Sequence, residues 1–180
     1  MLKTLMQKLD ELELNQYGLI DVQQIIFSDD VRKMCEMNSC GQYGKNWQCP
    51  PGVGSVESRR EKVLSFPCGL LFNMVYPLED SYDWEGMQAA GADFKQKFEQ
   101  VKDAVTAHVS GETLFLGAGA CSVCQTCAYQ EQKPCRFPER ATASMEASGI
   151  DVYTISGNFG FKYINGVNTV TYFGLALFHA

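Results

Sequence analysis

The spacing of apolar positions along the chain predicts several helices. Four leucines fall on one helical stripe over residues 2–14, with charged residues between them, as in an amphipathic helix. Phe and Val recur at helical spacing over residues 84–109, the longest pattern of this kind. Shorter helices are predicted after Ser28 and after Ser55, because a serine hydroxyl can cap the first turn of a helix. A last helix is predicted over about residues 138–148.

Segments rich in β-branched and aromatic residues predict strands between these helices. They cover residues 19–27, 68–76, 112–117, 150–155 and 167–178. The last of them could pair antiparallel with the one before it. Strands that alternate with helices are typical of an α/β or α+β sandwich. The expected fold is therefore a mixed sheet with helices, and two cysteine-rich metal-binding loops at one end.

The length of 180 residues is enough for one domain with a sizeable core, so residues 1–180 are expected to form a single cysteine-rich metal-binding domain. A weak internal repeat, over about residues 15–80 and 110–180, is also indicated. In each half a Cys–Pro corner precedes a predicted helix that leads into a strand. Such a repeat would bring both cysteine loops to the same end of a shared sheet.

Composition and charge narrow the classes of partner. Apolar residues make up 46% and charged residues 20%, which is typical of a folded globular chain. The formal net charge of −6 argues against nucleic acid as a partner, since phosphate binding needs a basic face. No apolar run is long enough to insert into a membrane. With no secretion signal in sight, we expect a cytoplasmic protein, and a homo-oligomer is compatible with the sequence.

The eight cysteines are the strongest chemical signal. Cys121, Cys124, Cys127 and Cys135 form a C-x2-C-x2-C run with a more distant fourth thiol, a spacing typical of [4Fe–4S] ligation. Small neighbours such as Gly119 let the backbone approach a compact inorganic core. Zinc is the alternative, although its sites usually use two separated C-x2-C pairs and would leave one thiol surplus. Disulfides are disfavoured in a reducing compartment.

A second group contains Cys35, Cys40 and Cys49, in a long loop dense in Gly, Pro and Asn. Long loops inside compact domains are usually functional or ordered by something else, and a bound metal would supply that order. The group could hold a second cluster, with Cys68 or a non-cysteine group as fourth ligand. Cys68 begins a predicted buried strand and could equally be a small core residue. Buried structural cysteines are the alternative for the whole group.

Three motifs resemble those of a prokaryotic family known as "predicted metal-binding protein", which is common in anaerobes and methanogens. They are Cys40-x3-Gly44-x2-Trp47-x-Cys49-Pro-Pro, Ala-Cys121-x2-Cys124-x2-Cys127-x7-Cys135-Arg-x-Pro138, and Ser144-Met-Glu-Ala-x-Gly-Ile-Asp-Val152. The resemblance spans most of the chain and implies metal binding through these thiols, in the form of iron–sulfur clusters. It implies no particular substrate. Unlike ordinary ferredoxins, the chain has seven residues before its fourth Cys and an Arg after it.

These observations lead to one main functional hypothesis and two alternatives. The main hypothesis is an iron–sulfur protein with one or two [4Fe–4S] clusters, acting as an electron-transfer or redox module in anaerobic metabolism. Such a module could be a component of an oxidoreductase and would have a redox partner protein. The alternatives are a zinc-binding structural or interaction module and a metal chaperone. No Ser–His–Asp, paired-carboxylate or P-loop pattern supports hydrolase or kinase chemistry.

Overall fold

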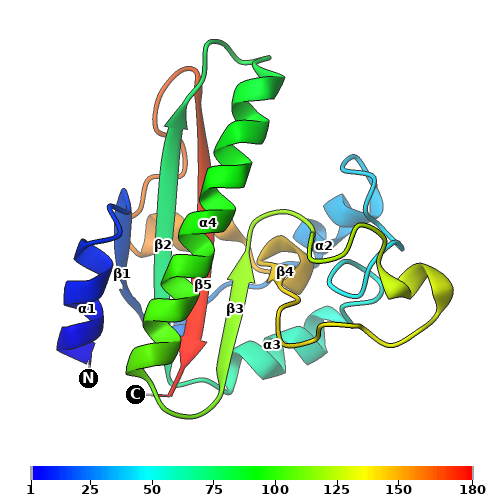
Figure 1. Ribbon diagram of the computed structural model, residues 1–180, viewed down its shortest axis with the longest axis horizontal. Helices are drawn as coiled ribbons and strands as arrows, with labels where there is room; N and C mark the ends of the chain where they lie inside the picture. The colour runs from blue at the N-terminus through cyan, green and yellow to red at the C-terminus, as the bar shows by residue number, and fades with distance from the viewer. Residues whose placement is uncertain (1, 180) are drawn as a thin grey trace.

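The computed structural model describes residues 2–179 and contains a mixed five-stranded sheet covered by helices (Figure 1). Neighbouring strands run antiparallel, except for β3 and β4, which are parallel. The predicted mixed sheet with helices is confirmed. In the sheet order β1-β2-β5-β3-β4, the strands are β1 (Gln16–Ile20), β2 (Cys68–Pro77), β5 (Thr169–Phe178), β3 (Thr113–Gly117) and β4 (Ala143–Ser144).

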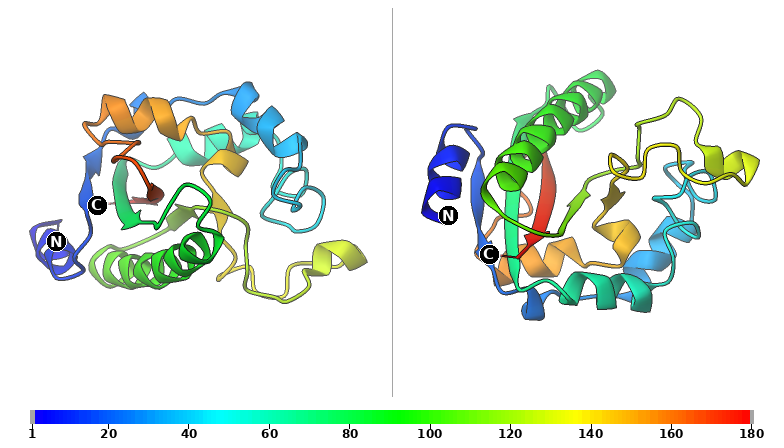
Figure 2. Two further views of the ribbon diagram at one scale, coloured as in Figure 1. Left: turned by 90° about the horizontal axis from the view of Figure 1, so that it is seen from above. Right: turned by 60° about the horizontal axis from the view of Figure 1, so that its bottom comes forward.

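Helices cover both faces of the sheet, as the view from above in Figure 2 shows. Helices α1 and α4 pack on one face, and α3 and α5 on the other. Within residues 2–179, no helix combines the length and the apolar character needed to cross a membrane. The helices are α1 (Leu2–Asp10), α2 (Asp29–Glu36), α3 (Val56–Leu64), α4 (Trp84–His108) and α5 (Val152–Asn158), with short 3-10 helices η1 (Val22–Gln24), η2 (Ala128–Glu131) and η3 (Glu146–Ser148).

The central strand β5 separates two apolar cores. Successive side chains of a strand point to opposite faces, so Leu175 and Leu177 enter the core beside α3 and α5, while Ala176 and Phe178 enter the core beside α1 and α4. All four are fully buried. Complete burial of a Leu or Phe side chain stabilises the fold by about 1.5–3 kcal/mol relative to an exposed one. This two-sided burial explains why β5 reads as a nearly continuous apolar run.

The sequence located most of these elements. The helices predicted over 2–14 and 84–109 correspond to α1 and α4, although α1 ends at Asp10. Ser28 and Ser55 cap α2 and α3 as predicted, and their hydroxyls accept hydrogen bonds from the amides of Asp30 and Ser58. The strands predicted over 68–76, 112–117 and 167–178 are β2, β3 and β5.

The strand predicted over 19–27 is wrong beyond Ile20. The Asp21 side chain accepts a hydrogen bond from the amide of Gln23 at 3.0 Å and begins η1. Of the apolar residues that follow, Phe27 forms only a single bridge, with Ile150. The β-branched residues Val22 and Ile25 of this segment are buried in the core, but they do not form strand hydrogen bonds with a neighbouring strand.

The helix predicted over 138–148 and the strand predicted over 150–155 are both wrong. Ala143 and Ser144 instead form β4, which pairs in parallel with the end of β3 at the edge of the sheet. Asp151 caps α5 by accepting the amide of Thr154 at 3.0 Å. The predicted helix-then-strand order after the second cysteine loop is therefore reversed, and β5 pairs with β2 and β3 rather than with the preceding segment. The division into two similar halves stays a prediction.

Candidate metal centre

The loop after β3 carries the C-x2-C-x2-C run beyond the β4 edge of the sheet (Figure 1). The structure brings all four cysteines of this main group together around one small cavity of about 20 Å³. Trp47 from the other cysteine loop and Phe137 also line this cavity. The thiols come from both sides of η2, at Cys121, Cys124, Cys127 and Cys135.

The second group surrounds a larger cavity of about 390 Å³. Cys35 lies in the last turn of α2, Cys40 in the turn that follows, and Cys49 just before Pro50. Cys49 is buried and Cys40 is exposed. The three predicted thiols therefore line a common space, between their own loop and the segment that leaves β3.

Hydrogen bonds within the chain order the loop that carries the second group. The amide of Gly44, which has a positive φ of 68°, donates to the carbonyl of Pro50 at 2.8 Å. The amide of Tyr43 donates to the Asn38 side chain at 3.0 Å, and the amide of Val53 donates to the carbonyl of Cys49 at 3.0 Å. A positive φ favours glycine, which explains a Gly at position 44. The expectation that a metal must supply the order of this loop is therefore not needed.

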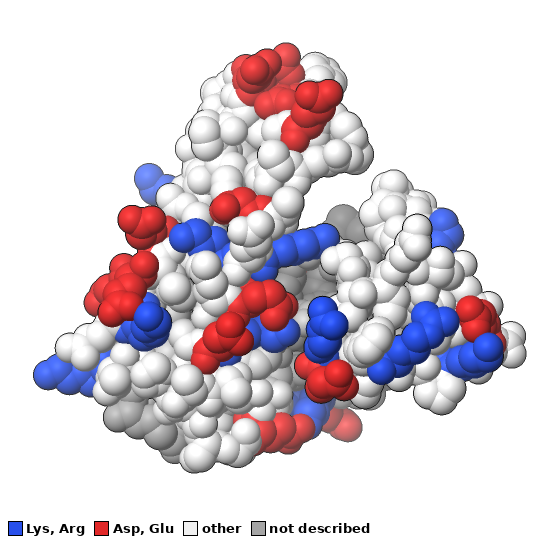
Figure 3. All heavy atoms as spheres, in the orientation of Figure 1, with Lys and Arg blue, Asp and Glu red and all other residues white. Residues whose placement is uncertain are grey.

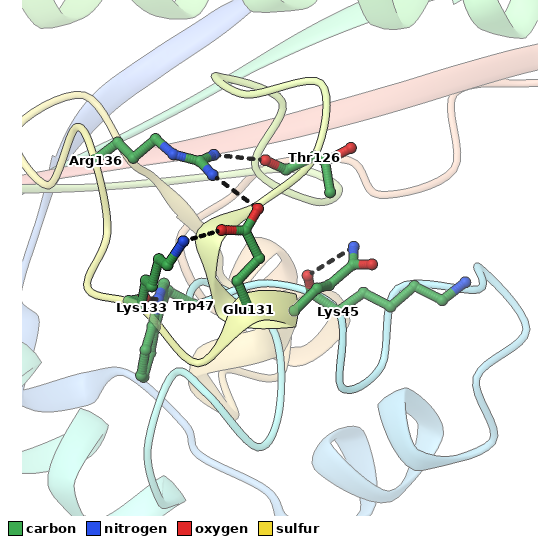
Figure 4. Close-up of polar contacts among 7 residues, drawn as sticks. Lys45, Trp47, Thr126, Glu131, Lys133 and Arg136 are labelled. Carbon is green, nitrogen blue, oxygen red and sulfur yellow. Dashed lines mark hydrogen bonds and ion pairs between the residues drawn. The ribbon is translucent and has the colours of Figure 1, made fainter.

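The two cysteine loops contact each other through both side chains and backbone (Figure 4). The indole Nε1 of Trp47 donates to the carbonyl of Lys133 at 2.9 Å, and the Gln130 side chain donates to the carbonyl of Lys45 at 3.3 Å. The Trp47 ring also meets the Tyr129 ring edge to face, with centroids 4.9 Å apart. An indole and a phenol in such a contact add packing to the hydrogen bonds. The loops that carry the two groups of cysteines are thus held together.

Arg136, which follows the last cysteine of the main group, closes its own loop. Its guanidinium donates to the carbonyl of Thr126 at 2.8 Å and to Glu131 at 3.3 Å, and Glu131 also pairs with Lys133 (Figure 4). The guanidinium therefore lies beside the backbone between Cys124 and Cys127. Because both ion pairs are partly exposed, each contributes at most about 1 kcal/mol to stability.

Asn46 lies between the two groups of thiols. Its buried side-chain amide donates a hydrogen bond to Sγ of Cys49 at 3.3 Å, and the same residue lines the cavity of the main group. Its side-chain oxygen accepts a hydrogen bond from the backbone amide of Gln48 at 2.9 Å. Both ends of the amide are therefore satisfied, which fixes its orientation.

Burial makes two thiols in the second group weaker acids. It raises the pKa of Cys35 and of Cys49, because a thiolate loses more than a thiol when water is removed. The Asn46 hydrogen bond acts in the opposite direction on the pKa of Cys49, while the neighbouring thiols of Cys40, Cys35 and Cys121 add to its rise. A metal would have to displace protons from these thiols in order to bind.

Cys68 lies outside both sites. It begins β2, pairs with Phe178 in the sheet and packs partly buried against the core beside α1 and α4. It lines neither of the two cysteine-lined cavities. Its position agrees with a core role and removes it as the fourth ligand of the second group.

The donor chemistry of both groups fits soft metals, since thiolate sulfur prefers zinc, copper(I) and iron–sulfur clusters. All eight cysteines are free thiols. However, within residues 2–179 no three His, Cys, Asp or Glu side chains are arranged so that they could hold a single metal ion. The structure therefore presents thiols that share cavities, but it does not present a closed single-ion site in the part of the chain described.

The charge around the cysteine loops differs from that of the rest of the face drawn in Figure 3. Basic side chains gather over the lobe that carries both loops, whereas acidic ones gather at the far end, over the connection from β2 to α4. Lys45, Lys133, Arg136 and Arg140 all belong to the cysteine loops or their continuation. The net charge of −6 is thus unevenly distributed.

Comparison with protein families decides what kind of domain this is. A family described as "Predicted metal-binding protein (DUF2284)" matches residues 18–178, which is nearly the whole chain. The chain belongs to this family. The match covers both cysteine loops and every strand except the first residues of β1. No curated protein and no solved structure matches the chain.

Two residues of the site carried no functional prediction from the sequence. Asn46 stands beside Trp47 in an Asn-rich turn and gave no signal of its contact with sulfur. Glu146 lies within the Ser144–Val152 motif, but nothing in its spacing pointed to the thiols. The structure places Glu146 in the wall of the larger cavity, far from the second group of cysteines in sequence but beside them in space.

Proposed function

We propose that Cys121, Cys124, Cys127 and Cys135 hold a [4Fe–4S] cluster and that the protein acts as an electron-transfer or redox module. The observation that carries the proposal is that four thiols with C-x2-C-x2-C-x7-C spacing line one cavity. Ligation by four cysteines is the usual way that such a cluster is held. When bound, the cluster would supply one-electron chemistry, and this chain would contribute the four thiolates and the packing of Trp47 and Phe137 around them.

The spacing of the thiols supports a cluster over a single zinc ion. Each iron of a [4Fe–4S] core takes one thiolate, so the ligands stay farther apart than around one tetrahedral ion. The C-x2-C-x2-C-x7-C spacing does not provide the two separated C-x2-C pairs that zinc sites usually use, and all four thiols line one cavity. The cavity of about 20 Å³ is narrow, so the loop would widen on loading. Most of residues 122–136 are exposed and lie clear of the sheet, which leaves room for that movement.

The second group would hold a further cluster through Cys35, Cys40 and Cys49. Three thiols and an adjoining cavity of about 390 Å³ support a site with one position that is not filled by cysteine. An open position is the arrangement by which catalytic metals admit a ligand. The protein could in that case be a component of an oxidoreductase in anaerobic metabolism, working in the cytoplasm.

The redox partner would dock near the cysteine loops, because electron transfer needs the partner close to the cluster. The basic side chains of this lobe favour a partner with an acidic docking face (Figure 3). Association should weaken as salt is raised, since exposed charges are screened.

Oxygen-free purification with an absorbance spectrum and analysis of iron, sulfide and zinc tests the proposal. We expect a brown protein whose broad visible band bleaches with dithionite, and about four or about eight iron atoms per chain for one or two clusters. A colourless protein with one or two zinc ions would overturn it in favour of a structural zinc module.

A pair of cysteine variants makes the test specific. Cys124→Ser is expected to lose the iron of the main group, whereas Cys68→Ala, which lies outside both cavities, is expected to keep full iron content. Equal iron in the two variants would contradict the assignment of the main group. Electron paramagnetic resonance of each reduced protein identifies which cluster has been lost.

A further inference from the structure

The larger cavity is enclosed by parts of the chain that are distant in sequence. The second cysteine group forms one wall, and the segment Ala118–Ala120 after β3 forms the next. The remaining wall comes from β4, η3, the start of α5, the loop that carries Tyr163 and the first half of β5. Its volume of about 390 Å³ falls within the range of about 300–1,000 Å³ that is usual for small-molecule sites. The cavity therefore has the size of a ligand site.

Every ionisable side chain in the cavity wall is an acid. The wall contains the three thiols, the carboxyl group of Glu146 and the phenol groups of three tyrosines. Among the described residues that line it, none is Lys, Arg or His. The carboxylate of Glu146, together with any thiolates that a bound metal has deprotonated, would give this space a negative potential. Such a wall attracts a cation and repels carboxylates and phosphates.

Glu146 is the key residue of this wall because its side chain is partly buried and forms no ion pair among residues 2–179. Burial raises the pKa of Glu146, while the Ser144 hydroxyl and the amide of Glu146 itself lower it through hydrogen bonds. Enclosed carboxylates are normally paired with a positive group. The side chain of Glu146 lines the cavity, so a positively charged ligand in that space could pair with its carboxylate.

Aromatic rings supply the rest of the surface that a cation would need. Tyr43, Tyr163 and Phe173 all line the cavity. The ring of Tyr163 is held in place by stacking on Phe173, with centroids 5.7 Å apart and an angle of 11° between their planes, and by an edge-to-face contact with Tyr153. Tyr163 is also close enough to Glu146 for that carboxylate to raise the pKa of the phenol, after the larger effect of burial. Aromatic faces beside an acid are the usual recognition surface for ammonium groups.

We propose that this cavity binds a small organic cation of the ammonium class, a protonated or methylated amine, with Glu146 as its counter-ion and Tyr43 and Tyr163 as its aromatic wall. The site is distinct from the thiols that would hold metal, although it adjoins those of Cys35, Cys40 and Cys49. It does not depend on which metal they bind. Two other roles for Glu146 give different results in the test below: direct ligation of metal, and hydrogen bonding to a neutral ligand.

Calorimetric titration of the oxygen-free protein with tetramethylammonium chloride tests the proposal, at constant total chloride and with iron measured on the same sample. We expect saturable binding of this ion, and of methylammonium, but none of tert-butanol, which is neutral and of similar shape. Equal binding of tert-butanol would overturn the cationic class in favour of a neutral ligand. No binding of either cation would overturn the proposal outright.

Three variants show whether the binding is at this site. Glu146→Gln is expected to weaken tetramethylammonium binding by at least about tenfold, the loss expected for one buried charge partner. Glu139→Gln, on an exposed loop residue, is expected to bind as the wild type does. If Glu146→Gln fails to fold, Glu146→Asp is used in its place, because it keeps the charge. The effect of the aromatic ring is measured separately, by comparing Tyr163→Leu, which lacks the ring, with Tyr163→Phe, which keeps it. Unchanged affinity in Glu146→Gln or Tyr163→Leu would overturn the site.

Iron content separates this inference from the proposed function. Binding of the cation by a protein without iron or sulfide would leave the site standing while the cluster assignment falls. A fully loaded protein that binds no cation would do the opposite. Loss of iron in Glu146→Gln would mean that the carboxylate ligates metal, and would overturn its role as counter-ion.

Discussion

The side-chain amide of Asn46 donates a hydrogen bond to Sγ of Cys49 across 3.3 Å, at the point where the two cysteine loops meet. A donor aimed at sulfur favours the thiolate over the thiol, and it also stabilises the reduced state of a cluster that the sulfur ligates. The residue is buried, and both the nitrogen and the oxygen of its side-chain amide are hydrogen-bonded, so the contact is built into the fold. Asn46 therefore belongs to the site although it is not itself a metal donor.

Replacing Asn46 with Ala should make Cys49 a weaker acid. The hydrogen bond lowers the pKa of Cys49 against the larger effect of burial, so its loss moves the pKa upward. Alkylation of Cys49 in the metal-free protein, followed by peptide mass spectrometry over a pH series, should then reach its half-maximal rate at a higher pH. In the loaded protein the potential of the second cluster should become more negative. Asn158→Ala, on the exposed end of α5, is the control, and a shift of equal size there would contradict the role of Asn46.

Trp47→Phe should loosen the contact between the loops without unfolding the domain. The variant removes the 2.9 Å hydrogen bond to Lys133 but keeps an aromatic ring beside Tyr129. A cost of about 0.5–1.5 kcal/mol is expected for one such bond. Hydrogen exchange should rise for amides of residues 128–135 while those of β2 and β5 stay protected. The other tryptophan, Trp84, is exposed, so Trp84→Phe should change neither region.

Asp151→Ala should destabilise α5 and, with it, the wall of the larger cavity. The carboxylate accepts two hydrogen bonds from Thr154, one from its backbone amide at 3.0 Å and one from its side-chain hydroxyl at 2.7 Å. Loss of such a cap typically costs about 0.5–2 kcal/mol. Urea unfolding measures this change in the free energy of unfolding, with the exposed helix residue Asp103→Ala as control. An effect no larger than that of the control would show that α5 depends on packing alone.

Metal removal should lower the thermal stability of the wild-type protein. Binding free energy of a metal held only by the folded state adds to the free energy of unfolding. For a domain of this size each kcal/mol corresponds to about 2–4 °C in Tm. Treatment with a strong chelator should therefore lower Tm by several degrees in the wild type and in Cys68→Ala, and by less in Cys124→Ser. Equal shifts in all three would indicate that the main group contributes no metal-linked stability.

The sequence by itself determined most of the helices and the strands β2, β3 and β5, because periodicity and serine caps act locally. Cys121, Cys124 and Cys127 line one cavity, and their short spacing in the sequence limits how far apart these thiols can lie. That they bind a metal stays a prediction. Prediction from the sequence failed at residues 143–155. There Ala143 pairs with β3, and Asp151 redirects an apolar segment into a helix in which Val152 and Ile155, three residues apart, can both be buried.

Only the tertiary structure decided which residues surround the thiols. Asn46 reaches Cys49 because the loop is closed by its own hydrogen bonds, and Glu146 reaches the same cavity because β4 joins the sheet edge beside β3. Cys68 lies outside the site because it is the first residue of β2 and packs against the core beside α1 and α4. These relationships depend on contacts between segments far apart in the chain, and such contacts leave no periodic trace in a single sequence.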